Sequence, residues 1–445
     1  MKLKPRIGFV FTSIEGIDAD QTRLVEFKKK FIEKMDSPEI ESIFVDFTVA
    51  SYVDASAANR MFSQCDPDVI CIVAAVWTPD TTVIKILERL EDIPVILYTT
   101  SLSEYTIGLN GAQLISATLK ELKIKYRFIF GNIDDNETVK DIFSYGMACT
   151  LVKKLKTTRI GLVGGRLSIM TNLTADEYGI KNVFGCTIIP VDFGKLEFFL
   201  KNVDAGRIKK KAEDINKIVK NISVDSAVLE ESVKYFLAFY DIVKEFELDA
   251  IAVNCYPFPY IKAKTCLAAS NLNDMGITYA CESDVNSAII MYMMKSITGS
   301  SSLNSDLIIE DQKANTLMFS HCGCGPFNCA ASPDNIRLEQ HFEVKSGMAV
   351  YYPVQTEGKD ATVVNLVGRE NTFRLCVLEG VTQKTPYTDY CGNPVTVKFE
   401  MPVKELINCI GNEGFGHHWM VSLDNLSSIF KNFCGLLNIK GLFIQ

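Results

Sequence analysis

The sequence predicts an α/β protein: two doubly wound α/β domains followed by a β-rich, barrel-like C-terminal domain. Three observations predict this architecture. Short apolar runs alternate with segments of helical spacing through the first third of the chain. The alternation begins again after the basic stretch Lys153–Arg159, and from about Ser305 strand-like runs separated by turns replace it. We therefore expect domains of residues 1–155, 156–298 and 299–445.

The strands of the first domain are short apolar runs, and one of them, Val69–Val76, is an uninterrupted apolar run typical of a central parallel strand. The expected strands are Arg6–Phe11, Ile43–Phe47, Val69–Val76, Pro94–Tyr98 and Tyr126–Phe130. The expected helices between them are Gln21–Lys34, Thr82–Leu90 and Asn110–Leu122.

The second domain repeats the pattern and the third departs from it. The second has expected strands at Ile160–Val163, Thr187–Val191, Ala250–Asn254 and Ile277–Cys281, and expected helices at Ala205–Val219, Val228–Glu247 and Val285–Ile297. Ser283 or Asp284 is a suitable cap for the start of the last helix, and Gly299 a suitable stop. The third has expected strands at Leu307–Ile309, Thr316–His321, Ala349–Val354, Thr362–Val367, Phe373–Glu379 and Val395–Phe399, and a final helix at Leu423–Leu437.

The composition is that of a folded protein, with 47% hydrophobic and 22% charged residues. A net charge of −8 argues against nucleic acid and anionic membrane surfaces as partners. The apolar run Ile7–Phe11 is too short for a secretion signal, and Val285–Ile297 is too short to span a bilayer. We therefore expect a cytoplasmic protein whose 14 cysteines are reduced, mostly buried thiols.

Glu282 is the first candidate for a functional residue. It follows the expected strand Ile277–Cys281 and precedes a helix, so it stands at the carboxyl end of a parallel strand, where α/β proteins bind ligands. The alternative is that its charge only complements the dipole at the start of the helix.

Histidine is scarce, with four in the chain: His321, His341, His417 and His418. The adjacent pair His417-His418 is flanked by Gly414, Gly416 and Trp419. On a glycine-rich turn, such a pair can present an imidazole to a metal ion together with distant carboxylates. The alternative is a structural pair bonded to backbone carbonyls.

Two other motifs are weaker. The spacing from Cys322 through Cys324 to Cys329 does not match a zinc knuckle. Gly164-Gly165 follows an expected strand but lacks the G-x-G-x-x-G pattern. A simple turn is therefore a better interpretation than a dinucleotide-binding site.

A combination of motifs resembles the L-fucose isomerase and L-arabinose isomerase superfamily. The stretch 280–284 with Glu282, the Thr298-Gly299 end of the helix, and Asp306, 24 residues after Glu282, carry the resemblance. It continues in residues 315–323 and 414–419, and the domain order is similar as well.

The resemblance implies an aldose–ketose isomerase that acts on a free sugar through a cis-enediol. It implies Mn²⁺, or another divalent cation such as Mg²⁺, held by Glu282, Asp306 and His418, with the two carboxylates also exchanging the proton. His417 and His321 would contact the substrate or supply an outer ligand. Trp77 would pack on the sugar from a neighbouring subunit, which implies a homo-oligomer, a trimer or hexamer.

Two alternatives remain open at this point. Two consecutive α/β domains also describe a sugar-binding or regulatory protein without turnover. A metal-dependent epimerase would begin with the same proton abstraction. No concentrated Arg/Lys cluster accompanies the candidate residues in the sequence, which favours an unphosphorylated sugar.

Overall fold

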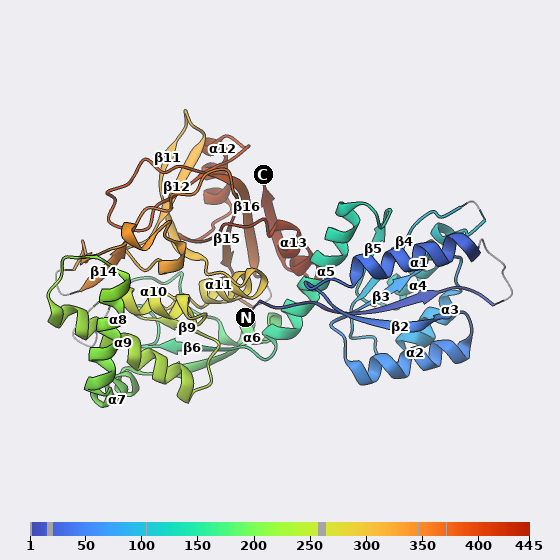
Figure 1. Ribbon diagram of the computed structural model, residues 1–445, viewed down its shortest axis with the longest axis horizontal. Coiled ribbons are helices and arrows are strands. Elements are labelled where there is room, and N and C mark those ends of the chain that lie inside the picture. Colours follow the sequence, from blue (N-terminus) through green and yellow to red (C-terminus); the bar gives the residue numbers. More distant parts are fainter. Residues whose placement is uncertain (1, 16–20, 104, 257–263, 345–346, 371) are drawn as a thin grey trace. The chain divides into compact units, whose positions relative to one another are not determined.

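The chain folds into two compact units, which contain its alternating strands and helices and its β-rich segments (Figure 1). The structure is a computed structural model that describes residues 2–15, 21–103, 105–256, 264–344, 347–370 and 372–445. The smaller unit contains residues 3–153 and 428–436, and the larger unit contains residues 1–2, 154–427 and 437–445. Among the described residues, no helix has the length and apolar character needed to cross a membrane.

The smaller unit is a doubly wound domain. Its parallel sheet has the order β2 (Glu41–Val49), β1 (Arg6–Thr12), β3 (Val69–Val73), β4 (Val95–Thr99) and β5 (Tyr126–Phe130). Its helices are α1 (Gln21–Met35), α2 (Tyr52–Cys65), α3 (Asp80–Leu87), α4 (Gly108–Glu121), α5 (Asn136–Leu155) and, from the C-terminal part of the chain, α13 (Ser427–Leu437). Alternate residues of β1 face opposite layers: Phe9 packs on Phe31 of α1, and Val10 joins the cluster formed with α2, α3 and α4.

The larger unit contains a second parallel sheet. Its strands have the order β10 (Thr278–Ala280), β9 (Ala250–Val253), β6 (Arg159–Val163) and β7 (Thr187–Val191). Its helices are α6 (Glu177–Val183), α7 (Phe193–Asn202), α8 (Ala205–Ile218), α9 (Ser226–Glu245), α10 (Cys266–Asp274) and α11 (Val285–Thr298). The core of this unit extends without a break from α9 and α10 to the strands of the third expected domain.

The β-rich part of the larger unit closes into a barrel. Its antiparallel strands pair in the order β15 (Asp360–Val367), β18 (His418–Ser422), β11 (Leu303–Asp311), β12 (Thr316–Ser320), β17 (Val395–Lys398) and β16 (Arg374–Gln383), and β16 pairs back to β15. The strand β19 (Lys440–Ile444) adds to β16 in parallel. The remaining elements are a small sheet of β14 (Met348–Tyr351), β13 (Arg337–Gln340) and β8 (Asn221–Ile222), the helix α12 (Val403–Asn412), and short 3₁₀ turns at Phe327–Cys329 and Pro333–Asn335.

The predicted fold class is confirmed: two parallel α/β sheets precede a β-rich, closed sheet. The single C-terminal helix predicted at Leu423–Leu437 is wrong in its first part, because β18 ends at Ser422 and α13 begins only at Ser427. The limits of the three predicted domains stay a prediction. All 14 cysteines lie within the described residues and are free thiols.

Candidate active site and metal centre

Glu282 stands in a tight turn between β10 and α11. Glu282 and Ser283 both have left-handed backbone conformations, with φ of 60° and 61°, which is costly for residues other than glycine. Hydrogen bonds hold the turn: the Ser283 N–H donates to the Val253 carbonyl (3.0 Å), and the Ser283 hydroxyl donates to the Gly165 carbonyl (2.7 Å). The Gly164-Gly165 turn therefore supports the turn that carries Glu282. Strain maintained by buried hydrogen bonds is typical of a functional position.

Strand register brings Asp306 and His418 to the same level of the barrel. Asp306 on β11 is the direct partner of His418 on β18, and of Ser320 on β12. Side chains of directly opposed residues lie on the same face of a sheet. His321 follows Ser320 at the end of β12. The neighbouring strands β18, β11 and β12 therefore bring His418, Asp306 and His321 close together. The prediction that His418 lies in a glycine-rich turn is wrong, because His418 is the first residue of β18.

Polar atoms from these elements face one another at short range. Glu282 Oε2 lies 3.4 Å from His418 Nε2 and 3.5 Å from His417 Nε2. Glu282 Oε1 lies 3.9 Å from His321 Nε2, and Asp306 Oδ1 lies 3.9 Å from His418 Nε2. The five predicted residues Glu282, Asp306, His321, His417 and His418 therefore form one cluster.

The cluster fits a metal ion. Its inward-facing atoms are buried and have no hydrogen-bond partner among the described residues: Glu282 Oε2, Asp306 Oδ1, His321 Nε2, His417 Nε2 and His418 Nε2. Buried polar atoms are normally paired, so a group of unpaired ones around a shared space indicates a ligand. The atoms of Glu282, His417 and His418, and those of Asp306, His321 and His418, lie within 4.8 Å of one another. Carboxylate oxygens with imidazole nitrogens suit a divalent cation.

Asp284 fixes the orientation of His418. Its Oδ2 accepts a hydrogen bond from His418 Nδ1 (2.8 Å), which leaves the lone pair of Nε2 facing Glu282 and Asp306. The same carboxylate caps α11, accepting the Ser287 N–H at 3.0 Å. Metal-binding histidines usually donate their second N–H to a carboxylate in this way. The sequence indicated Asp284 only as a possible cap, and its contact with a residue 134 positions later could not be inferred from that pattern.

His321 is arranged differently. Its Nδ1 accepts the N–H of Cys322 (2.9 Å), so the proton of the neutral ring is on Nε2, the atom that faces Glu282. A ring in this tautomer donates a hydrogen bond and has no free lone pair for a metal. The geometry therefore favours His321 as a contact to a substrate oxygen rather than as a ligand.

The electrostatics follow from these contacts. Burial alone would raise the pKa of Glu282, but the facing imidazoles of His417, His418 and His321 hold that pKa well below its usual value. Burial would likewise lower the pKa of His418, but the Asp284 and Glu282 carboxylates outweigh it and raise this pKa to about 9. In the metal-free protein at neutral pH, His418 is thus protonated, and it faces the ionised carboxylates of Glu282 and Asp284.

Metal affinity is consequently expected to rise with pH. A metal at His418 Nε2 must displace the proton there, so one proton is released on binding as long as the pH is below the pKa of about 9. The association constant should increase at least about tenfold per pH unit between pH 7 and pH 9 and then level off. Calorimetric Mn²⁺ titrations in buffers of different ionisation enthalpy measure both the constant and the proton count. An affinity independent of pH over this range would contradict the role of His418.

Trp77 belongs to the smaller unit, apart in the chain from the cluster. It follows β3, its backbone N–H donates to the Thr106 carbonyl (2.8 Å), and its Nε1 donates to Asn110 Oδ1 (3.1 Å). The role of Trp77 in binding a sugar stays a prediction.

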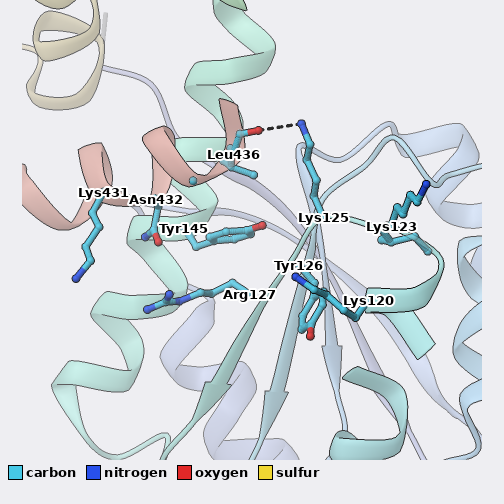
Figure 2. A pocket seen from close by; sticks show the side chains of 11 residues that line it. Lys120, Lys123, Lys125, Tyr126, Arg127, Tyr145, Lys431, Asn432 and Leu436 are labelled. Atoms are coloured by element: carbon cyan, nitrogen blue, oxygen red, sulfur yellow. Dashed lines mark hydrogen bonds between the residues drawn. The ribbon is translucent and has the colours of Figure 1, made fainter. Parts of the chain in front are cut away.

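A basic cavity of about 590 Å³ also lies in the smaller unit (Figure 2). Lys120, Lys123, Lys125, Arg127 and Lys431 contribute its charge, and Lys125 Nζ donates to the Leu436 carbonyl at 2.8 Å. None of the predicted site residues lines this cavity, and its basic side chains are exposed.

Comparison with known proteins gives similar isomerases at low identity. No family model matches the chain. A sulfoquinovose isomerase from Alkalicoccus urumqiensis is 24% identical over 363 residues, covering 79% of this chain and 81% of the relative. A sulfoquinovose isomerase from Priestia aryabhattai is 22% identical over 456 residues, covering 98% and 97%. A solved periplasmic sugar-binding protein from Legionella pneumophila covers 66% of this chain at 14% identity with a TM-score of 0.17, which is too low to support an argument.

These relatives correct one prediction and confirm another. The assignment to the L-fucose isomerase and L-arabinose isomerase superfamily is wrong, because the similar curated proteins, over most of the chain, are sulfoquinovose isomerases. A short motif around a pair of carboxylates does not by itself distinguish one family of isomerases from another. The prediction of an enzyme, an isomerase, is confirmed by the same relatives.

Proposed function

We propose that the protein is a metal-dependent aldose–ketose isomerase whose substrate is sulfoquinovose or a closely related sulfonated sugar. Sulfoquinovose is a six-carbon aldose with a sulfonate on carbon 6. The observation that supports this proposal best is the cluster of Glu282 and Asp306 around Nε2 of His418, in a chain similar to sulfoquinovose isomerases over most of its length.

Glu282, Asp306 and His418 would hold the metal. The ion, when bound, would polarise the two substrate oxygens and stabilise the negative charge that develops on them. Mn²⁺ suits this mixed set of carboxylates and imidazole better than Mg²⁺, which prefers oxygen ligands alone.

The residues of the chain would carry out the proton transfers. Glu282 is ionised at neutral pH because its pKa is held low, so its carboxylate can accept the proton from carbon 2 as that C–H bond breaks. The same carboxylate returns the proton to carbon 1 of the cis-enediol, while Asp306 passes the hydroxyl proton from the oxygen of carbon 2 to that of carbon 1. His321, which carries its proton on Nε2, would donate a hydrogen bond to one of these oxygens.

His417 and Trp77 would complete the substrate contacts. His417 Nε2 is buried and points at Glu282, although the side chain is 39% exposed, so it can reach a bound sugar. A site shared between subunits of a homo-oligomer remains part of this proposal, as does a cytoplasmic location.

The deciding experiment is to strip the protein with a chelator, reload it with Mn²⁺ and follow sulfoquinovose by NMR in deuterated water. We expect a ketose product, with deuterium at carbon 1 when proton exchange competes with return. An epimeric aldose would favour the epimerase alternative. Tight binding of the sugar with no product, with or without metal, would favour a binding protein and contradict the proposal.

A further inference from the structure

Lys264 is a buried cation without an adequate partner. Its side chain is 1% exposed, and its ammonium has no hydrogen-bond partner among the described residues. The ammonium lies 3.8 Å from the ring centroid of Tyr256 and 3.9 Å from Glu343 Oε2, which is too far for a hydrogen bond. That Glu343 oxygen accepts instead from the Tyr256 hydroxyl at 2.9 Å. Burying a charge without full compensation is costly, so a function for Lys264 is the better explanation.

His341 presents a second unpaired donor. It is 2% exposed, and its Nδ1 accepts the N–H of Glu343 at 3.2 Å, so the neutral ring carries its proton on Nε2. That Nε2 is buried and has no acceptor among the described residues. Burial, together with the charge of Lys264, lowers the pKa of His341 to about 4, so the ring is neutral at physiological pH.

Lys264 and His341 both contact Gly347. The backbone N–H of His341 donates to the Gly347 carbonyl (2.9 Å). A side-chain carbon added at Gly347 would come within 2.5 Å of the Lys264 Cβ. Both residues therefore pack on the same glycine, where no larger side chain fits.

His341 also lies near the candidate metal centre. Cys322 Sγ is 3.1 Å from His321 Nδ1 and within 4.8 Å of a ring nitrogen of His341. The Cys322 thiol thus lies between His341 and His321.

We propose that Lys264 and His341 form an anion subsite that binds the sulfonate at one end of the sugar while the other end lies at the Glu282–Asp306–His418 cluster. This inference rests on the proposed function and specifies its substrate class. The ammonium and the Nε2–H would each donate to a sulfonate oxygen, which pairs both buried groups at once. The subsite escapes a sequence search for basic clusters because it contains one lysine and one neutral histidine, 77 positions apart.

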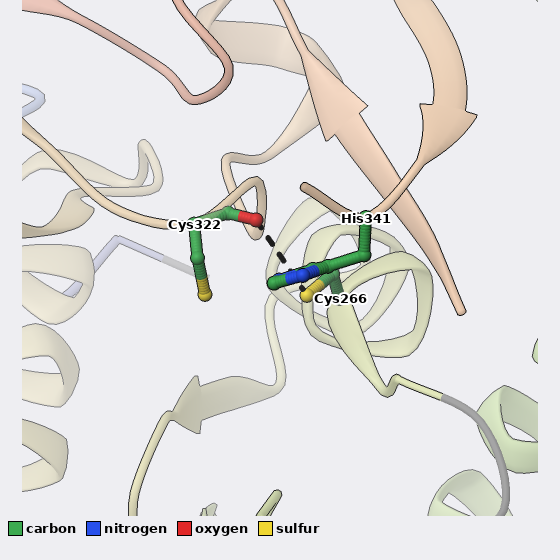
Figure 3. Close-up of side chains that lie close together, drawn as sticks. All are labelled: Cys266, Cys322 and His341. Carbon is green, nitrogen blue, oxygen red and sulfur yellow. Dashed lines mark hydrogen bonds between the residues drawn. The ribbon is translucent and has the colours of Figure 1, made fainter. Parts of the chain in front are cut away.

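The main alternative is a second metal site, because Cys266, Cys322 and His341 lie close together (Figure 3). The contacts argue against it. His341 Nδ1 is already engaged by the Glu343 N–H, so Nε2 carries a proton and offers no lone pair. A hydrogen bond with Cys266, together with burial, raises the pKa of the Cys322 thiol well above its usual range, which disfavours the thiolate that a metal would need.

The test compares sulfoquinovose with quinovose, the same sugar without the sulfonate, on the Mn²⁺-loaded protein. Lys264→Met keeps the length and apolar stem of the side chain but removes the charge. We expect it to lower kcat/KM for sulfoquinovose about 100-fold more than kcat/KM for quinovose. His341→Phe should change the same ratio in the same direction. Lys195→Met, which removes another lysine stacked on aromatic rings, is the matched control and should leave the ratio unchanged.

Binding separates this inference from the proposed function. Calorimetry should show at least about 100-fold weaker binding of sulfoquinovose to Lys264→Met than to wild type. Wild-type binding that depends on Lys264, without turnover of either sugar, would support the subsite and contradict the isomerase. Equal losses for both sugars in Lys264→Met, with its thermal unfolding unchanged, would overturn the subsite.

Discussion

Replacing Glu282 by glutamine is expected to lower kcat by about 1000-fold or more while the protein stays folded. The substitution keeps the shape of the side chain and removes the charge that accepts the proton. It also removes the carboxylate that lies 3.4 Å from His418 Nε2 and 3.5 Å from His417 Nε2, so the metal should bind more weakly as well. Ketose formation under saturating Mn²⁺ separates loss of the base from loss of the metal.

Glu310→Gln is a suitable control for this variant. Glu310 lies on β11, the strand that carries Asp306, but its side chain is exposed. The activity of the Glu310→Gln variant should stay within about twofold of wild type, as expected for a surface substitution. Turnover by Glu282→Gln at a level near that of the control, with saturating metal, would exclude Glu282 as the base.

The sequence specified the position of Glu282 well because local signals agree there. The apolar strand before it, the Asp284 cap and the Gly299 stop each follow from short-range chemistry, and the structure has Gly299 in the left-handed conformation with φ of 78°. The strand Val69–Val73 was predictable for a similar reason, since a continuous apolar run has few alternatives to a buried parallel strand.

Contacts between segments distant in the sequence were harder to predict from the sequence. The pairing of Asp306 with His418 depends on the register of β11 and β18, and a short strand after glycines gives little local signal for that register. No sequence motif marks Lys264, and its possible function can be recognised only once its burial is known. The family assignment went wrong because the motif 280–284 reports on a carboxylate at a strand end, and different sugar isomerases can share that requirement.

The strained turn at Glu282 and the buried ammonium of Lys264, which makes no hydrogen bond among the described residues, are both unfavourable for folding. Left-handed φ values at two consecutive non-glycine residues and a buried ammonium without a hydrogen bond both reduce stability. Both lie in the larger unit. Local violations of otherwise consistent sequence–structure rules are expected where function requires them.

Asp284→Asn is expected to lower metal affinity by about 10-fold to 100-fold without unfolding the protein. In the wild type, Asp284 Oδ2 accepts from His418 Nδ1 at 2.8 Å and keeps the lone pair on Nε2. An amide nitrogen at that position would donate instead, which favours the tautomer with the proton on Nε2 and removes the lone pair from the metal position. The remaining amide oxygen can still accept the Ser287 N–H, so the cap of α11 and the thermal stability should change little.

Ser287→Ala distinguishes this tautomer effect from a general disturbance of the turn. It removes the 2.6 Å hydrogen bond from the Ser287 hydroxyl to Asp284 Oδ2 but leaves the carboxylate facing His418. Its metal affinity should therefore stay within about threefold of wild type, since one neutral donor contributes little to the orientation of the ring. Nitrogen chemical shifts of His418 report the tautomer directly. If Asp284→Asn bound Mn²⁺ as tightly as Ser287→Ala, orientation of His418 by Asp284 would play no part in metal binding.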